Sequence, residues 1–317
     1  MKIVVACGGT SPEREVSLNS GEAVASALAE FGHDVIKADI RSPEELVINW
    51  ADYDADGVFV ALHGDWGEDG TLQACLAAHG IPFTGSGAEA CMFGMYKDVA
   101  RFLFEASGVR VAEGYAKHKG SNFDERDAVL LEKYGHLIVK PNSGGSTVGL
   151  TQVKTREDFE RGMEVAWNSY IYEEKALVEQ YVPGKEATCP VWERADGEVI
   201  ALPVIEIKPK EGFYDYKNKY THGSTVYECP ADFDAELTAE IQKMAVAAHK
   251  SLGARVYSRT DFRVTEDGVP YALEANLAPG MTSTSLVPKA AKAFGISFPE
   301  FLDEIVRVSF GIKRKYQ

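Results

Sequence analysis

Basic residues are scarce in this chain. Its 317 residues include 33 lysines and arginines against 48 aspartates and glutamates, which gives a formal net charge of −15. A protein that binds nucleic acid or an anionic membrane surface needs a concentration of cationic side chains, and the sequence contains no basic stripe. The composition therefore argues against nucleic-acid and membrane partners and favours small-molecule chemistry.

Cysteine is also sparse, and long apolar runs are missing. The five cysteines form no CxxC pair and no cluster with histidine, so we predict free thiols in a reducing compartment. No uncharged apolar stretch approaches the roughly 18 residues of a membrane helix. The apolar run at residues 2–7 is too short for a signal peptide. We therefore expect a cytoplasmic enzyme.

The first ninety residues alternate between apolar runs and helical patterns. Runs at residues 2–7, 34–40, 57–62 and 81–84 predict strands. After the first run, helical spacing predicts a helix that begins near residue 20 and stops at Gly32. This β-α-β alternation predicts a parallel sheet with helices on both faces. Ligands bind beyond the carboxyl ends of such strands, so the loops after the first and third strands are candidate binding segments.

A different pattern begins near Gly87. The spacing predicts one helix over residues 89–107, with Met92 and Phe102 on its apolar face. Antiparallel signals dominate from Pro183 onward. The chain is therefore predicted to combine an α/β part with α+β parts. The further predicted elements are strands at 137–140 and 176–182, helices at 157–163 and 235–251, and a hairpin that pairs 258–264 with 271–276.

The predicted hairpin carries the most informative polar residues. Side chains alternate along a strand, so Arg259, Asp261 and Arg263 share one face of the first strand. Glu274 and Asn276 share one face of the second strand. If these faces coincide, the hard oxygen ligands suit Mg²⁺ beside substrate phosphates. The alternative is a solvent-facing hairpin with salt-bridged charges.

A glycine-rich loop at residues 141–149 follows the strand that ends in Lys140. Its backbone N–H groups are suited to holding phosphates, although the lysine precedes the loop and the segment is therefore not a Walker A motif. Lys97 is a second cation able to reach a phosphate. The alternatives are a flexible connection and ordinary surface lysines.

The loop after the first strand contains acidic residues within segment 11–17, at a sheet edge where a substrate ammonium group would be held. The alternative is a capping box for the following helix. His63 ends the third strand at the same edge. Either a catalytic or a structural role is possible for this histidine.

Taken together, these segments resemble D-alanine:D-alanine ligase, an ATP-grasp enzyme, over essentially the whole chain. Each motif alone is modest evidence, but their common order and spacing are specific. The segments that carry the resemblance are GGTSPEREVSLNSG (8–21), LHGDWGEDGTLQ (62–73), IPFTGSG (81–87), VKPNSGGSTVG (139–149), VEQYVPGKE (178–186), FYDYKNKY (213–220), SRTDF (258–262) and EANLAPGMTSTSLVP (274–288).

The resemblance implies an ATP-grasp fold with three domains. These are an N-terminal parallel-sheet α/β domain (1–88), a small central α+β domain (89–177) and a C-terminal antiparallel-sheet α+β domain (178–317). ATP would lie between the last two. The implied reaction phosphorylates one D-alanine and joins it to a second for peptidoglycan precursor synthesis. The implied cofactors are ATP and Mg²⁺ or Mn²⁺, and the implied assembly is a homodimer.

The resemblance also assigns roles to residues. The ATP-binding positions are Lys97, Lys140, Gly145, Ser146, Thr147, Glu179, Gln180, Tyr181, Val182, Glu186 and Lys219. Among them, Glu179 to Val182 would meet adenine, and Glu186 would bind the ribose hydroxyls. The metal ligands are Asp261, Glu274 and Asn276. The substrate-binding positions are Glu15, His63, Ser285 and Leu286. The catalytic positions are Glu15, Ser146, Tyr220 and Arg259.

Several positions depart from the family pattern. Arg14 and Thr284 stand where histidine is common, Tyr96 where aspartate usually precedes the lysine, and Gly144 where the loop usually has glutamate. None of these changes removes a metal ligand or the catalytic arginine. Tyr220 favours an amine acceptor over a hydroxy acid. Two alternatives stay open: a ligase with a different D-amino or D-hydroxy acid acceptor, and a non-catalytic nucleotide-binding homologue.

Overall fold

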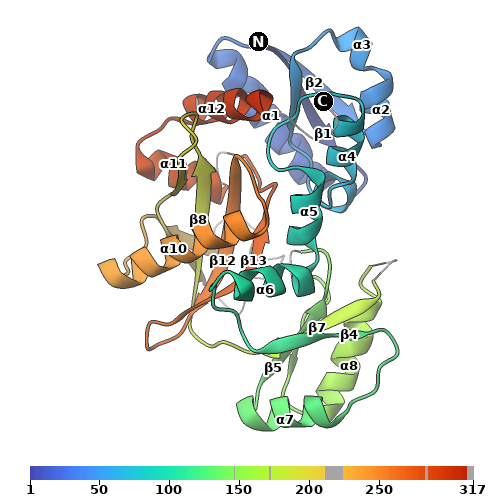
Figure 1. The fold of residues 1–317 in the computed structure, drawn as a ribbon, viewed down its shortest axis with the longest axis vertical. Coiled ribbons are helices and arrows are strands. Elements are labelled where there is room, and N and C mark those ends of the chain that lie inside the picture. The colour runs from blue at the N-terminus through green and yellow to red at the C-terminus, as the bar shows by residue number, and fades with distance from the viewer. Residues whose placement is uncertain (146, 171–172, 211–223, 283–284, 313–317) are drawn as a thin grey trace.

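The computed structural model describes the chain except for residues 146, 171–172, 211–223, 283–284 and 313–317, and its described part contains three sheets (Figure 1). The first sheet is parallel, in the order β2-β1-β3. Its central strand is apolar from Ile3 to Cys7, with Ile3 and Val5 packed toward one cluster and Val4 and Ala6 toward another. The N-terminal elements are β1 (Lys2–Gly8), α1 (Arg14–Glu30), β2 (Asp34–Ile40), α2 (Pro43–Ile48), α3 (Trp50–Tyr53), β3 (Gly57–Val60), a 3₁₀ turn (Asp65–Gly67) and α4 (Thr71–Ala78).

The second sheet is antiparallel, in the order β4-β7-β5-β6. Two helices pack against it, and each begins with a reciprocal capping box, at Asp124 and at Thr155. This small unit lies at one end of the molecule (Figure 1). Its elements are β4 (Gly114–His118), α7 (Glu125–Tyr134), β5 (Leu137–Pro141), β6 (Thr151–Val153), α8 (Arg156–Trp167) and β7 (Lys175–Gln180).

The third sheet is antiparallel, in the order β11-β10-β8-β12-β13, with β9 beside β8. Three helices contribute to the core next to it, through Cys91, Phe104 and Met244 among others. The elements are α5 (Ala88–Met95), α6 (Lys97–Ala106), β8 (Lys185–Glu193), β9 (Val199–Ala201), β10 (Ile205–Pro209), β11 (Thr225–Glu228), α10 (Ala235–Ser251), β12 (Tyr257–Val264) and β13 (Pro270–Asn276).

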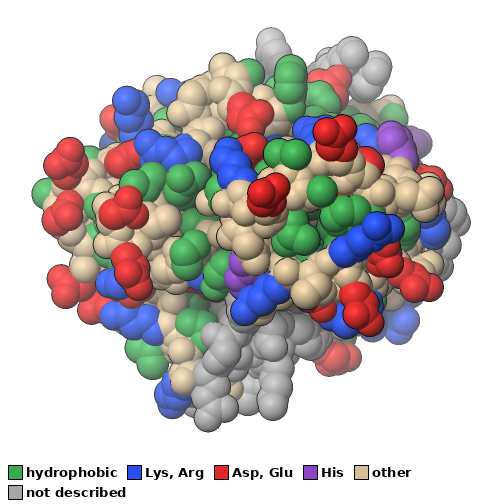
Figure 2. All heavy atoms as spheres, turned by 90° about the horizontal axis from the view of Figure 1, so that it is seen from below, with side chains coloured by type: hydrophobic (Ala, Val, Ile, Leu, Met, Phe, Trp, Pro, Cys, Tyr) green, Lys and Arg blue, Asp and Glu red, His purple; other side chains and the backbone are tan. Residues whose placement is uncertain are grey.

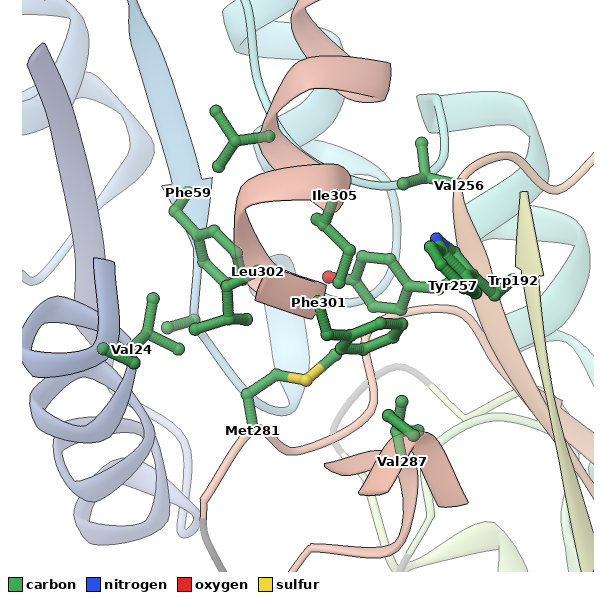
Figure 3. Close-up of a cluster of buried hydrophobic side chains, with 14 of the residues drawn as sticks. Val24, Phe59, Trp192, Val256, Tyr257, Met281, Val287, Phe301, Leu302 and Ile305 are labelled. Carbon is green, nitrogen blue, oxygen red and sulfur yellow. The ribbon is translucent and has the colours of Figure 1, made fainter. Parts of the chain in front are cut away.

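The last two helices, α11 (Leu286–Phe294) and α12 (Phe298–Gly311), return the chain to the N-terminal sheet. Phe301 and Leu302 of α12 lie between Phe59 of β3 and Trp192 of β8 in a single apolar cluster (Figure 3). This cluster joins the first and third sheets through one continuous core.

The single helix predicted over residues 89–107 is wrong. The helix is interrupted at Tyr96, whose backbone is extended, so α5 and α6 are separate helices. The next backbone N–H, that of Lys97, donates to the carbonyl of Asn142 instead of continuing α5 (2.9 Å). Met92 and Phe102 of the predicted apolar face are exposed, and the buried face of α6 contains Lys97 itself.

Two N-terminal predictions also need correction. The first helix begins at Arg14, not near residue 20, and no side chain caps it, so the capping-box alternative is wrong. The strand predicted at 81–84 is reduced to one parallel bridge, between Val58 and Phe83. The predicted parallel arrangement of the other three strands is confirmed.

The described residues contain no helix that is both long and apolar enough to span a membrane. Acidic and basic side chains are interspersed over the face seen from below, at the end formed by the second sheet (Figure 2). The division of the chain at residues 88 and 177 stays a prediction. Residue 177 lies inside β7, and α5 packs with the third sheet.

A buried histidine in α10 makes stability depend on pH. Burial lowers the pKa of His249 to about 4, with Arg255 and Lys250 lowering it further and Glu193 opposing them. Its Nδ1 lies 2.8 Å from the Ser258 hydroxyl. The unfolded chain therefore binds one more proton between about pH 4 and pH 6.5, so stability rises with pH across this window.

When the pH is lowered from 7 to 4.5, we expect the free energy of unfolding to fall by about 2 kcal/mol more in the wild-type protein than in H249Q. The carboxylates that titrate in both proteins cancel in this comparison. Urea unfolding at several pH values measures the difference, and parallel stability curves for the two proteins would contradict the assignment.

Candidate active site

One pocket between the second and third sheets collects most of the predicted nucleotide-site residues. It is lined from β5, the glycine-rich loop, β7, β8, β12 and β13. The predicted residues that line it are Lys97, Lys140, Gly145, Thr147, Glu179, Gln180, Tyr181, Val182, Glu186, Arg259, Asp261 and Glu274. Residues that are far apart in the sequence therefore share one site.

The hairpin brings its polar residues together as predicted. In the β12–β13 register, Arg259 lies opposite Asn276 and Asp261 lies opposite Glu274. Arg259 is buried and donates through Nε and Nη2 to the two carboxylate oxygens of Asp261 (2.8 Å each). The Thr188 hydroxyl donates to the same carboxylate (2.5 Å). The solvent-facing alternative is therefore wrong for this face.

The donor set fits a magnesium ion that also binds phosphates. Asp261 and Glu274 supply carboxylate oxygens on adjacent strands of the pocket. Asn276, two residues further along β13, has a carboxamide whose Oδ1 accepts the Ala278 backbone N–H (2.8 Å). In the residues that the structure describes, no group of three or more histidine, cysteine, aspartate or glutamate side chains forms a complete metal cage. A site with two carboxylates suits Mg²⁺, which takes its other oxygens from water and substrate phosphates.

The two predicted phosphate lysines are buried, so they are not ordinary surface residues. Lys97 donates through Nζ to the Gly144 carbonyl (2.5 Å) and lies 3.5 Å from Glu274. Burial, and then the charge of Lys140, lowers the pKa of Lys97, whereas Glu274 opposes this shift. When an anionic ligand binds, its charge stabilises the protonated form of a buried ammonium that lies near a second cation. The pair is thus suited to binding a polyphosphate.

Glu179 lies between two buried cations. Its Oε1 is 2.5 Å from Lys140 Nζ, and its Oε2 accepts from Arg101 Nη1 (2.9 Å). Arg101 also donates to the carbonyl of Ala112 (2.5 Å). The sequence analysis missed Arg101, because its partner comes from a strand far along the chain. The triad fixes the head group of Lys140 beside the pocket.

The predicted ribose end of the pocket contains a further ion pair. Arg263, on β12, donates to Glu186 of β8 (2.7 Å) and to the Val182 carbonyl (3.0 Å). Gln180, the last residue of β7, and Tyr181, the first of the connection to β8, also line this end. Their assignment to adenine and ribose stays a prediction.

The glycine-rich loop is anchored at its start. Asn142 accepts the Asp98 backbone N–H through Oδ1 (2.9 Å) and donates through Nδ2 to the Asp98 carboxylate (2.8 Å). Glu173 accepts both the backbone N–H and the hydroxyl of Ser143 (2.9 and 2.7 Å). These bonds contradict the alternative of an unsupported connection for this part of the loop.

His63 and Ser285 lie on either side of Gly280. A methyl group added there would be 3.1 Å from Ser285 Oγ and 3.8 Å from His63 Nε2. His63 is held by the Ser20 hydroxyl (2.9 Å) and approaches Glu68 (3.4 Å). The predicted substrate residues His63 and Ser285 are thus close together. The fourth, Leu286, is buried in the large apolar cluster at the start of α11.

Glu15 is not placed at the site. Its side chain is exposed in the first turn of α1. Glu13, at the N-cap of that helix, is half-buried instead, and its Oε2 would be 3.1 Å from a methyl group added at Gly64. Glu13 also raises the pKa of Tyr170, which lies against the glycine-rich loop. Glu13, which the sequence analysis did not assign, therefore lies against the loop that follows β3, whereas Glu15 faces solvent.

Four positions fall outside the described residues. Ser146, Lys219 and Tyr220, with the roles assigned above, stay predictions, as does the effect of Thr284.

The fold and the site together define an ATP-grasp protein, in which two antiparallel sheets enclose a pocket with buried lysines and carboxylates. The family model described as "D-ala D-ala ligase C-terminus" matches residues 103–307, and "D-ala D-ala ligase N-terminus" matches residues 49–86. The chain belongs to the D-alanine–D-alanine ligase family.

Individual relatives agree with this membership. A D-alanine–D-alanine ligase of Halalkalibacterium halodurans is 43% identical over 310 residues, covering 98% of this chain and 99% of that protein. The crystal structure of the Bacillus anthracis ligase complexed with ATP has a TM-score of 0.83 and 32% identity, covering 98% of this chain and 96% of that one. The VanG D-Ala:D-Ser ligase of Enterococcus faecalis has a TM-score of 0.81 and 30% identity, covering 97% and 99%.

Proposed function

We propose that this protein joins two D-alanine molecules in an ATP-dependent reaction that forms D-alanyl-D-alanine, ADP and phosphate, and so supplies a peptidoglycan precursor. The observation that carries the proposal is the convergence of Lys97, Lys140, Arg259, Asp261 and Glu274 on one pocket. A similar structure binds ATP. Relatives about 40% identical over nearly the full length are D-alanine–D-alanine ligases.

The reaction has two steps. A carboxylate oxygen of the first D-alanine attacks the γ-phosphorus of ATP, and ADP leaves. The amine of the second D-alanine then attacks the acyl carbon, phosphate leaves, and the amine gives up a proton as the peptide bond forms. Phosphorylation is needed because a free carboxylate is a poor electrophile.

The residues of this chain bind the charges that develop in these steps. Lys97 and Lys140 hold phosphate oxygens, and Arg259 stabilises the negative charge on the transferring phosphoryl group and on the tetrahedral intermediate. Asp261, Glu274 and Asn276 would hold Mg²⁺, which neutralises phosphate charge when bound.

The substrate ammonium is assigned to Glu13 in place of Glu15, because Glu13 is half-buried against the loop that follows β3 and Glu15 faces solvent. His63 and Ser285 lie at the same edge, where the second substrate would bind. A homodimer and a cytoplasmic location stay predictions.

Mass analysis of the products tests the function. The protein with ATP, Mg²⁺ and a mixture of D-alanine, D-serine and D-lactate is expected to release ADP and form chiefly D-alanyl-D-alanine, and EDTA is expected to abolish this. A different dominant product would assign another acceptor, which the likeness to a D-Ala:D-Ser ligase makes the relevant competitor. ATP binding without any amino-acid-dependent ADP release would instead support the non-catalytic alternative.

A further inference from the structure

Tyr170, in the connection between α8 and β7, lies directly against the glycine-rich loop. A methyl group added at Gly144 would be 2.3 Å from Cζ of the Tyr170 ring, so the ring occupies the space where a side chain at position 144 would begin. The Tyr170 hydroxyl lies 3.4 Å from the Gly145 carbonyl. The carbonyl of Gly144 in turn accepts from Lys97 Nζ. Tyr170 and Lys97 therefore both contact the same turn.

Two flanking contacts tie the same connection to the loop. A methyl group added at Gly149 would be 2.0 Å from Ser169 Oγ, and Glu173 accepts two hydrogen bonds from Ser143. The loop is thus contacted near its beginning, at its first turn and at its end. Gly144 and Gly149 both have positive φ, +74° and +75°, which glycine adopts without a steric penalty.

Tyr170 is half-buried beside the glycine-rich loop. Burial raises the pKa of its phenol, and the carboxylates of Glu13, Asp65 and Glu274 raise it further. Glu13 and Asp65 belong to the N-terminal loops, and Glu274 belongs to the hairpin. Carboxylates of both the N-terminal loops and the hairpin therefore act on the Tyr170 phenol.

We propose that Tyr170 is a positioning residue that holds the Gly144–Gly145 turn in its phosphate-binding conformation. The inference rests on the proposed function, because it takes the pocket to bind ATP. The ring fills the space beside Gly144, and this packing keeps the Gly144 carbonyl on Lys97. Without the ring the turn is no longer held in one conformation. The free energy needed to order the turn then reduces the affinity for ATP.

The test compares Y170A, Y170F and Y134A. Y170A is expected to raise both the dissociation constant for ATP, measured by calorimetry without D-alanine, and the KM for ATP about tenfold. Y170F keeps the ring and is expected to stay within twofold of the wild type. Tyr134 is a half-buried tyrosine of the same sheet unit that donates to Glu113, and Y134A is the matched control for loss of a tyrosine.

A second variant tests the contact itself. G144A is expected to weaken ATP binding more than tenfold, through the clash with the ring and through its positive φ. The double variant G144A/Y170A is expected to bind ATP no more weakly than the weaker-binding single variant, because the two changes act on one contact.

Three outcomes overturn the inference. They are unchanged ATP affinity in Y170A, an equal loss in Y134A, and additive effects of G144A and Y170A. Failure of the proposed function is distinguishable from these. If wild-type protein binds ATP but forms no D-alanyl-D-alanine, the substrate assignment fails while the effect of Tyr170 on ATP affinity is still measured.

Discussion

Replacing Arg259 by alanine is expected to lower kcat about a thousandfold while raising the KM for ATP less than tenfold. Arg259 is buried and forms two parallel hydrogen bonds with Asp261, so its guanidinium group is fixed before substrate arrives. A fixed cation stabilises charge that develops in the transition state more than charge already present in bound ATP. Steady-state phosphate release at saturating D-alanine measures both constants.

Two further variants separate this role from simple binding. R259K keeps the charge but loses the two-pronged contact with Asp261, and we expect an intermediate loss of kcat. Arg263 lies on the same strand at the ribose end of the pocket and pairs with Glu186, so R263A is expected to raise the KM for ATP more than it lowers kcat. An R259A protein with equal losses in ATP affinity and kcat would contradict the catalytic role.

The hairpin shows how far the sequence alone could lead. A strand has a period of two, so residues 259, 261 and 263 had to share a face, and a short turn restricts the register of the partner strand. Local rules therefore placed the two strands opposite each other, but the pairing of Asp261 with Glu274 depends on a β-bulge between Asp261 and Phe262 that shifts the register by one residue. The resemblance then assigned the lysines and the loop, and the pocket brings Lys97 and Lys140 together with the hairpin.

Other features depended on tertiary contacts that no local pattern reveals. The break at Tyr96 arises because Lys97 N–H bonds to Asn142, a residue 45 positions away in the sequence. Because α1 starts at Arg14, Glu13 rather than Glu15 lies against the loop that follows β3, and the ends of predicted helices are commonly uncertain by a few residues. Arg101 was missed because its role also depends on a tertiary contact: its carboxylate partner, Glu179, lies on β7.

Replacing Glu179 by alanine is expected to lower the free energy of unfolding by about 3–5 kcal/mol. Glu179 is buried and bonds to both Lys140 and Arg101, which are buried too. Removing the carboxylate leaves two cations in a region of low dielectric with no charge partner between them. Urea unfolding without nucleotide measures the loss, and ATP is expected to recover part of it by supplying negative charge near Lys140.

Controls decide whether the missing charge or the missing contacts produce this loss. E113A removes the partner of Lys133 in an exposed ion pair of the same sheet unit and is expected to change stability little. The double variant R101M/E179L replaces one cation and the anion by apolar groups, and it is expected to be more stable than E179A because one of the two cations that Glu179 neutralised is gone. Equal stabilities of E179A and the double variant would show that unpaired charge is not the cause.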